Sequence, residues 1–284
     1  MTGRRRSAHL AVATVLVVGA ASLDTGGAAL SAQTQSRGSN GWTAPRTADG
    51  QPDMQGHWAP AEGTSTQENI EEGTDAGHNK ILGRPMRRTT MIVDPPDQKV
   101  PYAPAAAARR KELFDNRDDP KTLEHVDPVA RCALPGVPRN AYMPFGYKIV
   151  QTPGYVVILN EAFHAYRIIP IDGRPHVNSA IELWMGDSRG RWEGNTLVVD
   201  VTNLNGQPWF DWAANFQSPT MQVVERWTLV GPDRIDYEAT ISNPSLYTRP
   251  WKMAFPIMRN DDPAHEIIEE ACHEGNRALE LMLR

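Results

Sequence analysis

The densest group of side chains able to do chemistry lies between residues 160 and 176. Glu161, His164 and Tyr166 bring a carboxylate, an imidazole and a phenol close together. A histidine can act as general acid or base near neutral pH, and a neighbouring carboxylate or phenol can orient it. On an extended strand, His164 and Tyr166 share one face, while Glu161 and Arg167 lie on the other. We therefore expect His164 to be catalytic, assisted by Glu161 or Tyr166, unless it is only hydrogen-bonded at the rim of a sheet.

Two further histidines are candidate catalytic residues. His176 follows the Asp172-Gly173 turn signal, so it should lie at a sheet end, where loops often carry function. The alternative is an ordinary solvated turn residue. His273 stands near the C-terminus, where it could reach a site or merely interact with the carbonyls at a helix end.

Substrate binding is expected from basic and aromatic side chains of the same region. The candidates are Arg167, Arg174, Arg189 and Trp192. An arginine can hold a carboxylate or phosphate with two parallel hydrogen bonds. The acidic residues of the charged segment 187–193 could instead pair with its arginines.

No cofactor or metal is expected. The sequence has no HxxxH, HxH or CxxC spacing, so a metal site would need distant ligands such as His164, His176 and His273. Dinucleotide fingerprints and phosphate-binding P-loops are absent from the sequence.

The first 32 residues have the layout of a secretory signal peptide. Three arginines precede an uncharged run from Leu10 to Leu23, and small residues follow it. A transmembrane helix needs about 20 apolar residues, so we expect cleavage and no stable membrane insertion. Without residues 1–32 the chain holds 26 basic and 33 acidic residues, a net charge of −7. That sign disfavours nucleic-acid binding, and we expect a secreted or periplasmic protein.

The chain has two cysteines, Cys132 and Cys272. In an exported protein a single disulfide is the economical interpretation. The alternative is a reactive Cys272 thiol beside His273.

The elements that must position these residues are mostly strands. Hydrophobic alternation and turn signals predict strands at 147–151, 155–161, 163–170, 181–185, 191–192, 196–203, 223–230 and 234–241, and a last one through Trp251 and Phe255. Helices are expected at 105–114, 264–272 and 277–283, with Ile267, Ile268 and Ala271 facing a core. Residues 33–53 have the composition of a flexible linker. The sequence thus predicts one mainly β domain, residues 54–284: an antiparallel barrel-like sheet with irregular N-terminal decoration and a helical C-terminal segment.

Several strings resemble a family of exported bacterial proteins of unassigned function. They are DGQPDMQGHW (49–58), CALPGVPR (132–139), DGRPH (172–176), GRWEGNTLVVD (190–200), YTRPW (247–251) and ACHEGN (271–276). The resemblance implies secretion and a β-rich domain, and no established reaction. His57 departs from the family pattern where an apolar residue is expected, and Asn195 departs where Asp is expected.

A weaker similarity is to lipocalin-like barrels, whose first strand opens with Gly-x-Trp, as Gly56-His57-Trp58 does. A barrel of about eight strands can hold one small ligand. We therefore expect a small-molecule ligand or substrate. The first hypothesis is a cofactor-free acid/base enzyme of hydrolase, lyase or isomerase type, and the alternative is a non-catalytic lipocalin-like carrier.

Overall fold

The computed structural model describes residues 42–61, 68–72 and 90–282, all of which belong to one compact unit. The expected signal peptide, residues 1–32, and the first part of the expected linker lie outside the described residues. The rest of the expected linker, residues 42–53, is not a flexible linker, because Ala44 is buried and Trp42 packs against the core.

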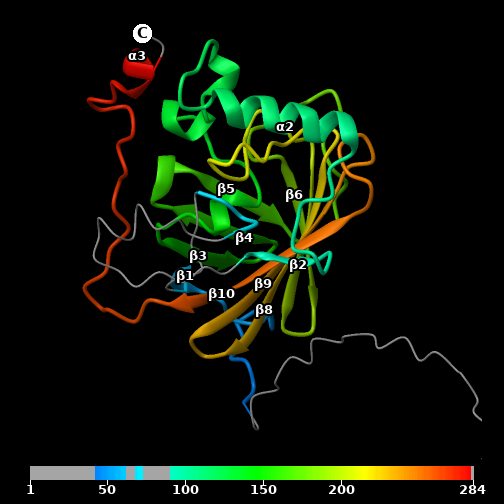
Figure 1. The fold of residues 1–284 in the computed structure, drawn as a ribbon. Coiled ribbons are helices and arrows are strands. Elements are labelled where there is room, and N and C mark those ends of the chain that lie inside the picture. Colours follow the sequence, from blue (N-terminus) through cyan, green and yellow to red (C-terminus); the bar gives the residue numbers. More distant parts are fainter. Residues whose placement is uncertain (1–41, 62–67, 73–89, 283–284) are drawn as a thin grey trace, which may run out of the picture. The chain divides into compact units, whose positions relative to one another are not determined.

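The described residues form a mainly β fold, which confirms the expected class (Figure 1). Its strands are β1 (Gly56–Pro60), β2 (Ile92–Asp94), β3 (Tyr147–Thr152), β4 (Tyr155–Asn160), β5 (Tyr166–Pro170), β6 (Asp187–Glu193), β7 (Thr196–Thr202), β8 (Gln222–Gly231), β9 (Arg234–Ser242) and β10 (Trp251–Arg259). Nine strands follow the order β5-β4-β3-β1-β10-β9-β8-β7-β6, and β2 pairs with β10 beside this path. Every pairing is antiparallel.

The two end strands of the sheet, β5 and β6, approach each other and nearly close a barrel. The guanidinium of Arg167 on β5 donates a hydrogen bond of 2.9 Å to Ser188 Oγ on β6. Farther along, a Cβ at Gly190 would lie 2.8 Å from Ile169 Cγ2, closer than ordinary contact, so only glycine fits there. We call this line of approach the seam.

The hairpins form where the sequence alternates in hydrophobicity. On β8, β9 and β10 every second side chain is buried, and Trp227, Tyr237 and Phe255 meet as neighbouring rings inside the barrel. Because successive side chains of a strand point to opposite faces, alternation alone selects the inner set. Gly194 supplies a positive φ of 61° at the β6–β7 turn.

One predicted strand begins later than expected, and another, at 181–185, does not form. Residues 162–164 form a short 3₁₀ turn, η4 (Ala162–His164), and the strand begins only at Tyr166. The antiparallel partners β4 and β5 need a reversal between them, and Phe163 and His164 supply it with φ values of 59° and 51°. Residues 181–185 form no strand, since Leu183 makes only an isolated bridge to Leu204.

Two of the three predicted helices are present in the structure, and one is not. Helix α2 (Pro104–Asn116) confirms the expected helix at 105–114, and α3 (Ala278–Met282) lies within the expected 277–283. Residues 264–272 are not helical, and Ile268 of the expected buried face is 63% exposed. Contacts to distant side chains hold this stretch, as described below. The remaining short 3₁₀ helices are η1 (Leu123–His125), η2 (Pro128–Arg131) and η3 (Arg139–Ala141).

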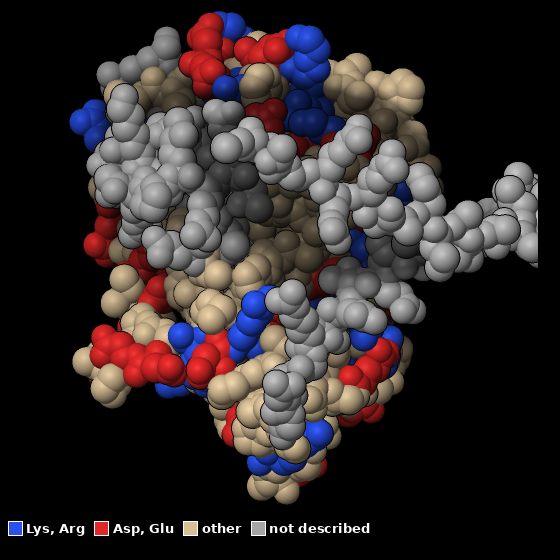
Figure 2. Space-filling view, turned by 60° about the horizontal axis from the view of Figure 1, so that its bottom comes forward, with Lys and Arg blue, Asp and Glu red and all other residues tan. Residues whose placement is uncertain are grey.

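Charged side chains of both signs lie side by side on the face seen in Figure 2. Within the described part of the chain, no helix has the length and apolar character that crossing a bilayer requires.

Candidate acid/base site

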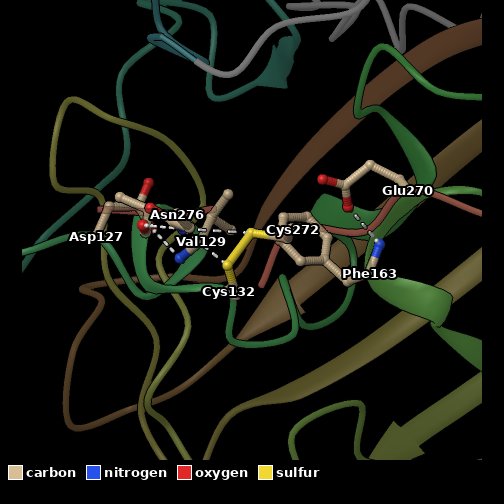
Figure 3. Close-up of a disulfide and its surroundings, with 8 residues drawn as sticks. Asp127, Val129, Cys132, Phe163, Glu270, Cys272 and Asn276 are labelled. Carbon is tan, nitrogen blue, oxygen red and sulfur yellow. Dashed lines mark hydrogen bonds between the residues drawn. A yellow bond between two sulfur atoms is a disulfide. The ribbon is translucent and has the colours of Figure 1, made fainter. Parts of the chain in front are cut away.

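A disulfide anchors the chain that follows the last strand. Cys132, directly after η2, is bonded to Cys272, so the two form a bridge as predicted (Figure 3). The other anchors include Asn276, whose side-chain amide donates to the carbonyl of Ala130. A bridged Cys272 cannot act as a nucleophile, which removes the alternative of a reactive thiol. We call residues 261–277 the C-terminal segment.

The C-terminal segment crosses the end of β4 and covers Glu161. The backbone N–H of Glu270 donates to the carbonyl of Glu161 over 3.3 Å, and its carboxylate accepts a bond from the N–H of Phe163 (Figure 3). Glu161 lies directly after β4, and its side chain is only 9% exposed. Its Oε2 accepts a 2.8 Å hydrogen bond from the backbone N–H of Gly146. This bond fixes the orientation of the carboxylate.

The histidine that faces Glu161 is His265, not His164. His265 Nε2 lies 3.5 Å from Glu161 Oε1, and the imidazole is 25% exposed. The ring of His57 stands edge-on to the ring of His265, with 5.0 Å between centroids. His57 is on β1 beside Lys148 on β3, on the opposite face from the buried Trp58. Strand pairing and the C-terminal segment therefore bring Glu161, His57 and His265 together; we call these three residues the Glu161 cluster.

The electrostatics of the cluster favour a neutral imidazole at His57. Burial lowers the pKa of His57 below its usual 6.5, and the charges of Lys148 and His265 lower it further, against the opposing effect of Glu161. At neutral pH a lowered pKa leaves the imidazole with a free lone pair. A neutral imidazole, a second imidazole and an oriented carboxylate are groups that can accept, relay and return a proton.

His164 itself lies at the end of η4, where its Nε2 is 2.9 Å from Glu269 Oε1. The two side chains are 48% and 77% exposed. The expected common face with Tyr166 depended on a continuous strand, and the turn at η4 removes it. Tyr166 is 63% exposed on the outside of β5.

His176 belongs to a second, separate group on the outside of β6 and β7. Its Nδ1 lies 2.7 Å from Asp187 Oδ2, and its Nε2 lies 3.4 Å from Asp200 Oδ2. Arg189 Nη1 lies 2.7 Å from the other oxygen of Asp187, and Arg189 Nε donates to the carbonyl of Pro175. Arg189 is thus already paired with groups of the protein itself. This is the alternative to substrate binding that the acidic residues of segment 187–193 had left open.

The other predicted site residues are dispersed. Arg174 is bonded to Asp172 and Tyr155 at the surface, and the hydrogen bonds from Arg174 to Asp172 lower the pKa of Asp172 to about 2. Trp192 packs against the core from β6. His273 is exposed beside the disulfide, and its expected approach to the site is not seen. Arg167 points into the barrel, where it meets Glu225.

Sequence reasoning missed His57, His265 and Glu225. His57 had a signal, because it replaces an apolar residue of the resembling family. Glu225 had one too, since it occupies a position that alternation in β8 turns inward. His265 had none, because its partner Glu161 is distant in sequence and separated from it by six strands.

The string Gly186-Asp187-Ser188-Arg189-Gly190 fits the Gly-x-Ser-x-Gly pattern of serine hydrolases. That pattern needs a sharp turn between a strand and a helix. Ser188 instead lies within β6 and points inward to Arg167, so the match has no catalytic context.

The chain matches no protein-family model and no curated protein. Fold and site define a mainly β protein with an antiparallel barrel-like sheet and a histidine–carboxylate cluster beneath a disulfide-anchored segment. Among the described residues, no group of three or more His, Cys, Asp or Glu side chains could hold a metal ion.

Proposed function

We propose that the protein is an exported enzyme that performs cofactor-free acid/base chemistry on a small organic substrate, with the Glu161 cluster as its site. The observation that carries the proposal is the pairing of an oriented, nearly buried carboxylate with His265, beside a His57 whose pKa is lowered. A histidine with a shifted pKa, such as His57, is more common at functional sites than elsewhere. The reaction would be a hydrolysis, an elimination or an isomerisation.

Each member of the cluster has a role that its surroundings support. His57 acts as the base, because its imidazole is neutral near pH 7. Glu161 orients His265, which acts as the acid. The charge of Lys148 contributes to the lowered pKa of His57. The same charge would attract an anionic group of the substrate.

Export is supported by the signal layout of residues 1–32 and by the disulfide, which forms and persists in oxidising compartments.

The test compares wild-type protein with Glu161→Gln and His57→Asn. Each is incubated with a defined mixture of small esters, hydroxy acids and carbonyl compounds, and product formation is followed by mass spectrometry. We expect either substitution to lower turnover by roughly 10² to 10⁴, the contribution of one positioned acid or base. Wild-type turnover should rise with pH through a midpoint below 6.5, as His57 loses its proton.

The matched control is Glu193→Gln, which changes an exposed carboxylate at the β6–β7 turn that pairs with Arg191 and Arg226. It should retain wild-type turnover. Equal turnover in wild type, Glu161→Gln and His57→Asn would overturn the assignment of this site.

A second candidate function is a lipocalin-like carrier. The observation that favours it is the aromatic interior of the barrel, where the rings of Tyr147, Trp227 and Tyr237 are in contact. A carrier should retain a small molecule in native mass spectrometry after purification, equally in wild type and in Glu161→Gln. Catalytic conversion without retention would favour the enzyme instead.

A further inference from the structure

A row of side chains crosses the outer face of the sheet beside the Glu161 cluster. Strands β1, β3, β4 and β5 are neighbours in this order (Figure 1). His57 on β1 is directly opposite Lys148 on β3. Lys148 is opposite Leu159 on β4, which is opposite Tyr166 on β5. Because neighbouring strands are about 4.8 Å apart and directly paired side chains share one face, an imidazole, an ammonium group and an apolar surface follow one another along this row.

Lys148 differs from the other lysines that the structure describes. Each of the others pairs with an acidic side chain; they are Lys99, Lys111, Lys121 and Lys252. Lys148 is half-buried, and no acidic side chain of the described residues pairs with it. After burial, its charge has the largest influence on the pKa of His57, which it lowers more than Glu161 raises it. The ammonium group is therefore available to an anion.

Two acidic side chains of the C-terminal segment contact the turn between β4 and β5. The carboxylate of Glu269 lies 2.9 Å from His164 Nε2. The carboxylate of Glu270 accepts a hydrogen bond from the N–H of Phe163. Both carboxylates are thus engaged at this turn, and neither supplies the counter-charge of Lys148.

Beyond Lys148, the outer face of β4 and β5 is apolar and open to solvent. Leu159 is 38% exposed, Tyr166 is 63% exposed and Ile168 is 52% exposed. Ile168 is opposite Val157, in the next row along the same two strands. We call Leu159, Tyr166, Ile168 and Val157 the outer platform. Because a contiguous exposed apolar surface marks a place where another molecule binds, and because these side chains face solvent, the outer platform has room for a ligand above it.

We propose that the substrates of the Glu161 cluster are small amphipathic anions, whose negative group is held by Lys148 and whose apolar body lies on the outer platform. The inference rests on the acid/base function proposed above and names its substrate class. His57 stands on the other side of Lys148 from the outer platform, so it meets the part of the substrate next to the negative group. A neutral molecule would leave Lys148 without a counter-charge, and an anion without an apolar body would leave the outer platform uncovered.

The test is a calorimetric titration of the full mature protein at pH 7, with 4-phenylbutyrate as the probe. The comparison compounds are 4-phenylbutanamide, which keeps the apolar body without the charge, and acetate, which keeps the charge without the apolar body. We expect 4-phenylbutyrate to bind about tenfold more tightly than either, since a hydrogen bond to a charged group is stronger than one between neutral groups. Added salt should reduce the preference over the amide, because salt screens a partly exposed charge.

Three variants separate the charge from the apolar surface. Lys148→Met keeps an aliphatic stem and removes the charge, so it should weaken 4-phenylbutyrate about tenfold, to the affinity of the amide, and leave the amide unchanged. Tyr166→Ser/Ile168→Ser should weaken both compounds about tenfold and preserve their ratio, because it removes apolar contact area. Lys252→Met is the matched control, because Lys252 is a strand lysine already paired with Glu238, and it should bind both compounds as the wild type does.

A melting curve on each variant shows that it is folded. Equal affinity for 4-phenylbutyrate and 4-phenylbutanamide, no binding of either, or an unchanged preference in Lys148→Met would overturn the proposal. So would a dimer in sedimentation equilibrium that Tyr166→Ser/Ile168→Ser dissociates, because a second copy of the chain would then cover the outer platform. Glu161→Gln should retain the binding preference. Binding without turnover in any protein would therefore contradict only the acid/base function, whereas turnover without the preference would contradict only the substrate class.

Discussion

Glu161 at the end of β4 faces His265 of the C-terminal segment, with 3.5 Å between the carboxylate oxygen and Nε2. Glu161 follows β4 in the middle of the sheet region of the chain, and His265 follows the last strand, β10. Their approach depends on where the C-terminal segment is anchored, and the Cys132–Cys272 disulfide is its covalent anchor. The candidate site and the disulfide are thus physically linked.

Removing the disulfide should lower the stability of the fold. It should also make the position of His265 in the Glu161 cluster less well defined. In the chain-entropy account, a bridge spanning 140 residues constrains the unfolded chain by about 5 kcal/mol, and measured losses are commonly about 2 to 5 kcal/mol. We expect Cys132→Ser/Cys272→Ser to show such a loss in urea unfolding and to weaken turnover. Non-reducing peptide mapping of the wild type should yield the cross-linked peptide; two free thiols would contradict it.

Breaking the interior ion pair from one side should be more harmful than replacing it whole. Arg167→Met leaves the charge of Glu225 buried without its counter-charge, and such losses are typically about 3 to 5 kcal/mol. Arg167→Met/Glu225→Leu leaves no charge behind, so we expect the double variant to be more stable than Arg167→Met alone. Denaturant unfolding of wild type, both single variants and the double variant measures the coupling. Additive effects would contradict it.

Asp211 should make stability fall as pH rises. Burial raises the pKa of Asp211 to about 6, whereas its usual value is 3.8. Between these values the folded protein holds a proton that the unfolded chain has released. The stabilisation is therefore complete below pH 3.8, declines as the pH rises to about 6, and is absent above pH 6. The two-unit difference corresponds to about 3 kcal/mol. Unfolding free energies at pH 4 and pH 7 should show this decline in wild type relative to Asp211→Asn; parallel pH profiles would contradict it.

His164→Ala separates the expected catalytic role from a surface ion pair. The imidazole of His164 is half exposed and paired with Glu269. Its removal should therefore lower the free energy of unfolding by only about 0 to 1 kcal/mol. We expect wild-type turnover in the same assay that detects loss in Glu161→Gln. A fall of roughly 10² to 10⁴ in a protein of normal melting temperature would instead make His164 the catalytic residue that the sequence suggested.

Some of this protein could be predicted from contiguous residues. The alternation in 234–241 and the turns at Gly194 and at 231–233 define β7 to β9 closely, because side-chain period and turn chemistry are local properties. Of β6 only the end, at 191–192, was predicted. Local patterns failed at 163–164, where two residues other than glycine adopt positive φ to complete the reversal between β4 and β5. They failed again at 264–272, where helical spacing was overridden by contacts to Glu161, His164 and Cys132.

By itself the sequence determined the class of fold, the inner faces of the hairpins and the pairing of its only two cysteines. It also predicted Glu161 as an assisting catalytic residue and Arg167 as a substrate-binding residue. Only the tertiary structure decided that Glu161 meets His265 rather than His164, and that Arg167 turns inward to Glu225. The reason is physical: a partner across the barrel is set by how the whole sheet curves and closes, and by where the disulfide anchors the chain, and neither is a property of neighbouring residues.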